Sequence, residues 1–151
     1  MTRALTIFIA IIALACAALA AEKSLQLTTL PVKVQRTIQD NLKGGEIKNI
    51  GKETEHGVAQ YEVESILNGK HRDFNVDTKG NLVAVEEETS IDAVPATAKA
   101  TIMKKVGGGT LGMVETFTKP GAETMYEAAW KDKNGKNHEV LVKADGTEAK
   151  D

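Results

Sequence analysis

This sequence has little cysteine, few aromatic residues and no surplus of basic charge. Its one cysteine, Cys16, lies inside an apolar N-terminal segment. If that segment is removed, the rest of the chain has no thiol, which excludes a disulfide framework, a cysteine nucleophile and a thiolate metal site. The 19 basic residues are outnumbered by 21 acidic ones. Without a strongly basic field, nucleic acid is not expected as a partner.

The first twenty residues have the pattern of a secretory signal peptide. A short basic start at residues 1–3 is followed by an almost wholly apolar run over residues 4–17 and by the small-x-small sequence Ala18-Leu19-Ala20. This order of basic, apolar and small residues is what signal peptidase reads. We therefore predict a signal peptide over residues 1–20 and an exported mature chain, periplasmic or secreted, without a membrane segment.

Two alternatives for this segment stay open from the sequence. The apolar run reaches Ala21 and is long enough to serve as an uncleaved membrane anchor. Lipid attachment at Cys16 is disfavoured, because a lipoprotein signal has a branched aliphatic residue where Ala13 stands.

The rest of the chain contains an internal sequence repeat of two copies. The stretch LPVKVQRTI at residues 30–38 returns 64 positions later as VPATAKATI at residues 94–102. Further matches follow in the same order: Leu42 with Val106, Gly44-Gly45 with Gly108-Gly109, Ile47 with Leu111, Tyr61 with Tyr126, Asn68-Gly69-Lys70 with Asn134-Gly135-Lys136, Asn75 with Leu141, and Gly80 with Gly146. An ordered series of this kind predicts two copies, at residues 28–90 and 92–151.

Each copy predicts a helix followed by about four short antiparallel strands. Apolar residues recur every fourth position over residues 30–42 and again over 94–106, and glycines follow each stripe. The period then changes to two, with Tyr61 and Val63 in the first copy and Tyr126, Ala128 and Trp130 in the second on the side that would pack on the helix. The fold class is therefore α+β, with helices on one face of the sheet.

The opposite side of these strands is acidic and polar. We expect it to face water or a partner that presents basic groups. The candidate partner-binding residues on this side are Glu62, Glu64, Asp73, Asn75, Asp77, Glu127 and Glu139.

No arrangement typical of catalysis or of a cofactor is present in the sequence. The three histidines are His56, His71 and His138, and of these only His71 has a carboxylate two residues away, in Asp73. That spacing alone is weak as a metal signal. The triple glycine at 107–109 lacks the strand before it and the Lys-Ser/Thr after it that a phosphate loop requires. We predict no catalytic residue, no cofactor and no metal site.

The order Leu30-Pro31, Ile38, Gly45-x-Ile47, Tyr61-Glu62-Val63 and Asp77-x-x-Gly80 resembles the PepSY-like family, which is also described as β-lactamase-inhibitor-like. The resemblance covers nearly the whole mature chain and is weaker in the second copy. It implies an exported bacterial protein built of two tandem units, with helices on one side of a curved sheet and an open concave side. It carries no catalytic motif.

These observations predict an exported, non-enzymatic binding protein that inhibits or modulates an exported hydrolase or protease through its open sheet face. Two other classes stay open: a structural or stress-related envelope protein with no enzyme target, and a small-ligand or metal carrier. The sequence names no particular partner in the cell envelope and does not set the oligomeric state.

Overall fold

The computed structural model describes residues 24–55 and 57–149, and their contacts divide the chain into two units. The first unit contains residues 24–88 together with 117–123, and the second contains residues 89–116 and 124–149. The predicted signal peptide at 1–20, Cys16 within it, and His56 lie outside the described residues. Helices and antiparallel strands follow one another along the chain, so the predicted α+β class is confirmed.

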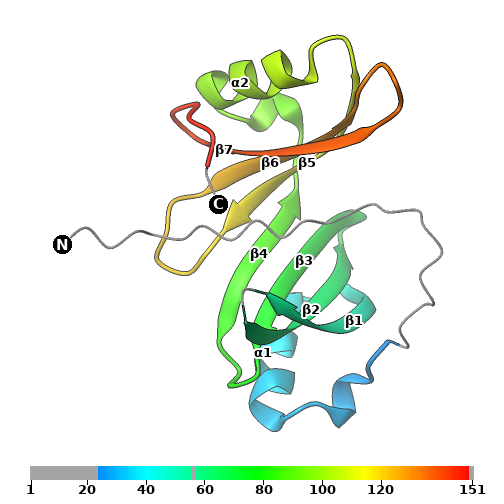
Figure 1. Ribbon diagram of the computed structural model, residues 1–151. Coiled ribbons are helices and arrows are strands. Elements are labelled where there is room, and N and C mark those ends of the chain that lie inside the picture. Colours follow the sequence, from blue (N-terminus) through cyan, green and yellow to red (C-terminus); the bar gives the residue numbers. More distant parts are fainter. Residues whose placement is uncertain (1–23, 56, 150–151) are drawn as a thin grey trace. The chain divides into compact units, whose positions relative to one another are not determined.

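The first unit consists of a helix on a four-stranded antiparallel arrangement. A short 3-10 turn, η1 (Leu27–Thr29), precedes α1 (Val32–Leu42). The strands are β1 (Glu46–Glu55), β2 (Val58–Leu67), β3 (Lys70–Asp77) and β4 (Leu82–Glu88). They lie side by side in chain order. Helix α1 packs against β2 and β3 (Figure 1), so the opposite face of these strands is free of helix.

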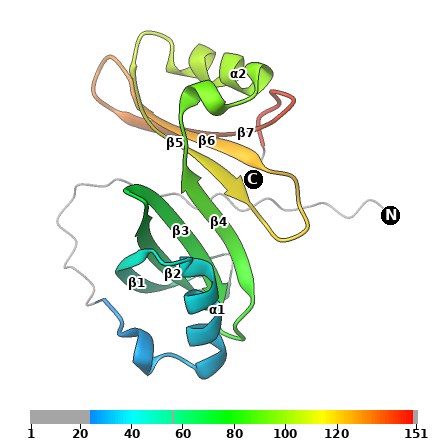
Figure 2. The ribbon, with the colours of Figure 1, turned by 180° about the vertical axis from the view of Figure 1, so that it is seen from behind.

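The second unit has the same order of elements. The 3-10 turn η2 (Ile91–Ala93) precedes α2 (Ala96–Val106), and β5 (Thr110–Thr118), β6 (Met125–Lys131) and β7 (Asn137–Lys143) follow. Helix α2 packs on β6 and β7 (Figure 2). Where the sequence predicts a fourth strand, the described residues form a single bridge between Val142 and Glu148.

Both helices bury the apolar stripe that the sequence predicts. Each has 11 residues and begins directly after a proline, Pro31 or Pro95, whose missing N–H leaves no donor unsatisfied. Ile38 of α1 and Ile102 of α2 are both 0% exposed, at the centre of two separate apolar cores. None of the described helices is long and apolar enough to cross a membrane.

A glycine shortly after each helix lies so close to a strand carbonyl that no larger residue fits there. The amide of Gly45 donates to the carbonyl of Leu42 at 2.7 Å, and that of Gly109 donates to the carbonyl of Val106 at 2.9 Å. A Cβ on Gly45 would lie 2.8 Å from a carbonyl oxygen of β2, and one on Gly109 would lie 2.4 Å from a carbonyl oxygen of β6. These close approaches fix where each helix meets its strands.

A threonine in each helix binds a distant glycine turn. The Thr37 hydroxyl donates to the Gly80 carbonyl at 2.6 Å, and the Thr101 hydroxyl donates to the Gly146 carbonyl at 2.8 Å. Both glycines have a positive φ, +88° and +87°, in the region that favours glycine. The same pair of residue types therefore joins helix to turn in both units.

Candidate functional site

The helix-free face of the first unit is held by hydrogen bonds between side chains. Glu53 on β1 accepts hydrogen bonds through Oε1 from the amide groups of Gln60, at 2.7 Å, and Asn75, at 2.9 Å. Gln60 and Asn75 are both buried. Two buried amide donors thus share one half-buried carboxylate across three neighbouring strands, and buried donors need such a partner.

Asp73 is buried on the same face and accepts a hydrogen bond from a backbone amide. Its Oδ1 accepts a hydrogen bond from the Ser65 amide at 2.9 Å. Burial raises the pKa of the Asp73 carboxyl, and the Ser65 hydrogen bond and the nearby His71 only partly offset that effect. Glu86 on β4 lies directly opposite Asp73 in the strand register and is also buried. The face therefore concentrates acidic groups away from water.

Asp77 has a local role at the end of β3. It accepts hydrogen bonds from the backbone amides of Lys79 and Asn81, both through Oδ1, and from the Asn81 side chain through Oδ2. Its slight burial would raise its pKa, but the Asn81 and Lys79 hydrogen bonds outweigh burial and lower it. Asp77 thus closes the turn between β3 and β4, an Asx-type role.

Three carboxylic side chains come together on the helix-free face of the second unit. Glu127 on β6 is 5% exposed, Glu115 on β5 is also buried, and Glu139 on β7 is half-buried. Burial, followed by the charges of Glu139 and Glu115, raises the pKa of Glu127 to about 8. Its Oε2 atom is buried and accepts no hydrogen bond from any residue that the structure describes. A buried acceptor in this state is costly unless a donor reaches it.

The residue opposite each glutamate in the strand register differs between the two faces. Glu62 lies opposite Asn75 in the β2–β3 register, and Glu127 lies opposite Leu141 in the β6–β7 register. Leu141 is 1% exposed, and Met125, two residues before Glu127, is also buried. The second unit therefore places an apolar side chain opposite its central carboxyl, where the first unit places an amide.

A cavity of about 290 Å³ opens beside this carboxyl. The acidic side chains Glu115, Glu127 and Glu139 line it, together with the apolar residues Leu111 and Met113. All twelve lining residues belong to the second unit. The cavity therefore combines apolar walls with a carboxyl that lacks a donor, which is the usual make-up of a binding site.

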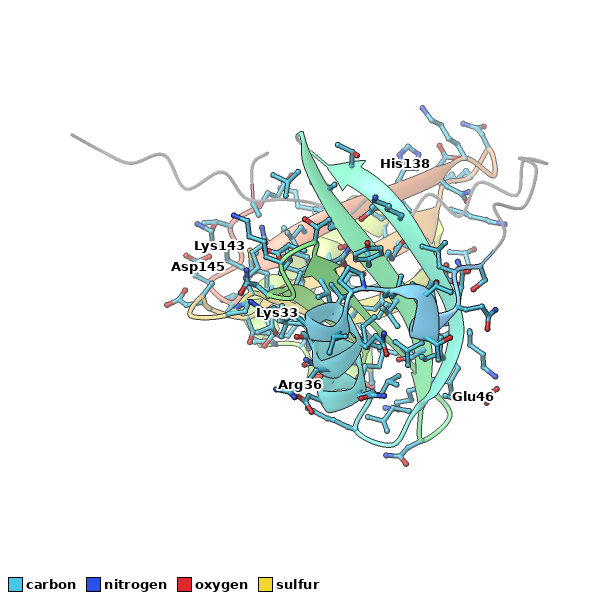
Figure 3. The ribbon with its side chains drawn as sticks, turned by 90° about the horizontal axis from the view of Figure 1, so that it is seen from below. Lys33, Arg36, Glu46, His138, Lys143 and Asp145 are labelled. Atoms are coloured by element: carbon cyan, nitrogen blue, oxygen red, sulfur yellow. The ribbon has the colours of Figure 1, made fainter. Side chains whose placement is uncertain are left out.

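Trp130 lies beside the second core, as the sequence predicts, and also stacks on a histidine. It is half-buried, and its ring centroid lies 5.3 Å from that of His138. His138 Nε2 lies 3.0 Å from Asp132 Oδ2, a contact that is the main cause lowering the pKa of Asp132. His138 and Lys143 mark the two ends of β7 (Figure 3). These contacts fix the β6–β7 turn at the edge of the cavity.

The predicted partner-binding residues differ in exposure. Among them, Asp73, Asn75 and Glu127 are buried, Glu62, Asp77 and Glu139 are half-buried, and Glu64 is exposed. The sequence predicts that these side chains face water or a partner; the three buried ones lie away from water, because side-chain hydrogen bonds and neighbouring apolar residues accommodate polar groups there. That these residues bind a partner stays a prediction. Within residues 24–55 and 57–149, no group of three or more His, Cys, Asp or Glu side chains is placed to hold a metal ion.

Sequence reasoning missed Glu115, which joins Glu127 and Glu139 around the cavity. The signal that could have found it is the alternation of Met113, Glu115 and Phe117 along residues 110–118.

No family model and no curated protein sequence matches this chain. Several solved structures share its fold. A DUF2874 family protein from Bacteroides ovatus is 15% identical, with a TM-score of 0.63, over 81% of this chain and 86% of its own. A predicted periplasmic protein from Bacteroides eggerthii is 14% identical, with a TM-score of 0.65, over 80% and 86%. A BLIP-like protein from Bacteroides fragilis is 20% identical, with a TM-score of 0.53, over 76% and 82%. At these identities the likeness establishes a BLIP-like fold.

Proposed function

We propose that this chain is an exported, non-enzymatic protein that binds a protein partner in the cell envelope through the helix-free face of its strands. The observation that carries this proposal is the buried Glu127 carboxyl, whose Oε2 lacks a donor beside a cavity with apolar walls. A partner that supplies a basic group would satisfy it. The proposed consequence of binding is inhibition or modulation of an exported hydrolase or protease.

The fold likeness supports the same class of function. One similar structure is a predicted periplasmic protein, and another is a BLIP-like protein. Together with the signal-like residues 1–20, they favour a periplasmic or secreted protein. Binding proteins of this kind need a shaped surface and no reacting group, and the described residues offer a surface of that type.

We also propose that the two units are tandem copies of one PepSY-like module, with boundaries at residues 28–90 and 92–151. Equivalent hydrogen bonds support it: Thr37 to Gly80 in one unit and Thr101 to Gly146 in the other. The threonines are 64 positions apart and the glycines 66, which agrees with the drift in the sequence match. A duplicated module leaves one copy free to keep structural hydrogen bonds while the other changes its surface.

Site-specific photo-cross-linking in the native host tests the proposed binding face. A photoreactive residue would replace Glu62 or Glu139 on the helix-free faces, with matched controls at Arg36 of α1 (Figure 3) and Met103 of α2, both exposed. We expect a discrete protein adduct from at least one strand position and none from the helix controls. Adducts from the helix positions alone would place the binding surface elsewhere, and no adducts at any position would favour a structural envelope protein.

A further inference from the structure

We propose that the cavity of the second unit receives one long basic side chain of the protein partner. Its ammonium or guanidinium group would bind the Glu127 carboxyl once that side chain turns its buried Oε2 toward the cavity, and its methylene stem would lie along Leu111 and Met113. This inference rests on the proposed function and specifies what the partner must present. It makes the second unit the anchoring site.

The charges around Glu127 favour a cation. Glu115 reaches the cavity from β5 and Glu139 from β7, so both neighbouring strands contribute negative charge. The basic and titratable groups that also line the cavity are Lys131, exposed at the end of β6, and His138, which is already held by Asp132. A buried carboxylate without a hydrogen-bond donor gains most from a charged donor, since charge-assisted hydrogen bonds are the strongest available to it.

The size and walls of the cavity favour a side chain over a larger ligand. Its volume of about 290 Å³ lies just below the roughly 300–1,000 Å³ of small-molecule sites. Lysine and arginine have an apolar stem and a charged tip, and they bury the stem where apolar surface is available. Leu111, Met113 and Ala129 provide such a surface on the way to the carboxyl.

Binding of a cation here is expected to release a proton. Burial, then Glu139 and Glu115, raises the pKa of Glu127 to about 8, so the empty cavity holds a protonated carboxyl at neutral pH. A cation favours the ionised form and therefore lowers that pKa on binding. By linkage, the affinity rises with pH until the carboxyl of the empty cavity is ionised, and we expect about tenfold weaker binding at pH 6.5 than at pH 8.

The probe for this inference is a single capped amino acid. The ¹⁵N-labelled chain from Ala21 onward would be titrated with N-acetyl-L-lysine methylamide and its arginine counterpart, with the norleucine counterpart as the neutral control. We expect saturable shifts of the amides of β5, β6 and β7 with either basic compound and none with norleucine. Shifts with norleucine of the same size, or none with the basic compounds, would overturn the inference.

A comparison with n-butylamine separates a partner's side chain from a free small amine. Binding of the lysine compound at least as tight as that of n-butylamine means that the mouth of the cavity accepts a backbone. If n-butylamine binds and the lysine compound does not, the occupant is a free amine, and the inference as stated is wrong.

Variants assign the binding to the cavity. Glu127→Gln removes the charge and Ala129→Leu fills the space, and each should weaken binding of the lysine compound at least tenfold. Glu123→Gln, on an exposed residue outside the cavity, removes the same charge and should change nothing. Equal losses in all three variants would indicate a general charge effect. Failure of these titrations while the strand-face cross-links persist would reject the basic anchor and leave the proposed function standing.

Discussion

Glu62 and Glu127 occupy corresponding positions: each lies on the second strand after the helix of its unit and directly follows a tyrosine, Tyr61 or Tyr126. Their surroundings nevertheless differ. Asn75 lies opposite Glu62, and Leu141 lies opposite Glu127. On the first face the Asn75 amide donates at 2.9 Å to a nearby carboxylate, Glu53. On the second, Leu141 has no donor to offer.

The difference teaches how one strand pattern can give two kinds of surface. An amide at the cross-strand position supplies a donor, and the carboxylates nearby stay compatible with burial. A leucine at that position gives dry packing but leaves the carboxyl with an unfavourable burial. On the first face the Gln60 and Asn75 amides donate to Glu53, whereas the proposed function has Glu127 of the second face bind a group from a partner.

The largest expected loss of stability comes from truncating side chains in the apolar cores of the two units. Ile38 and Ile102 are both 0% exposed, so truncation of either to alanine should lower the free energy of unfolding by about 2–5 kcal/mol. Chemical denaturation measures the loss. A large loss at one position with none at the other would contradict equivalent helix packing in the two units.

A smaller loss of stability is expected from substituting the glycines of the two turns. A Cβ on Gly80 would lie 2.8 Å from Lys33 Cβ, and one on Gly146 would lie 2.9 Å from the Thr97 carbonyl oxygen. Both residues also have positive φ, so Gly80→Ala and Gly146→Ala should each cost about 1–3 kcal/mol. Thermal unfolding of the two variants should show matching losses. The neighbouring Thr78→Ala, on an exposed side chain, is the control and should leave the midpoint unchanged.

The pH dependence of the free energy of unfolding should differ between variants of Glu127 and Glu62. Glu127 has a pKa of about 8 in the folded chain against an ordinary 4.5, so the folded state holds this proton more tightly than the unfolded state. Its contribution is full below about pH 4.5 and is lost as the pH rises to about 8. Glu127→Gln should therefore remove much of that loss and stabilise the chain at pH 8 by on the order of 1–3 kcal/mol.

Glu62→Gln is the matched control for this experiment, because it makes the same chemical change at the position that faces Asn75. Asp73 and Glu139 also have raised pKa values, so some loss of stability with rising pH should remain in both variants. Identical pH profiles for Glu127→Gln and the unchanged chain would refute the assignment.

A smaller effect follows from exchanging the residue opposite the glutamate. Leu141→Asn brings the amide of the first face to the second and should lower the pKa of Glu127 by about one unit, as a hydrogen bond to the charged form does. Carbon-detected NMR titration of the Glu127 carboxyl measures it. Leu141→Ala, which removes packing without adding a donor, should not lower that pKa through hydrogen bonding.

The fold was largely predictable, because period-four and period-two patterns are local. Ile38 and Ile102 lie where the stripes put them, and the strands alternate as expected around Tyr61 and Tyr126. The single bridge at Val142 in place of a fourth strand was not predicted. It follows a stretch without the alternation that marks the other strands.

The state of the polar face was not predictable from alternation. The pattern assigns a side chain to a face, but burial and hydrogen bonding depend on which residue lies opposite and on what the neighbouring strands bring. Asn75 and Gln60 meet Glu53 only because three strands align, and Glu115 reaches Glu127 in the same way. Such contacts join residues far apart in sequence, so no local period encodes them.

The most direct test of this account is the titration of the Glu127 carboxyl in the unbound chain, followed by ¹³C NMR on selectively labelled glutamate. The account predicts a pKa near 8 and a decrease when N-acetyl-L-lysine methylamide is added. A carboxyl that titrates near the ordinary 4.5 and does not respond to the lysine compound would contradict it.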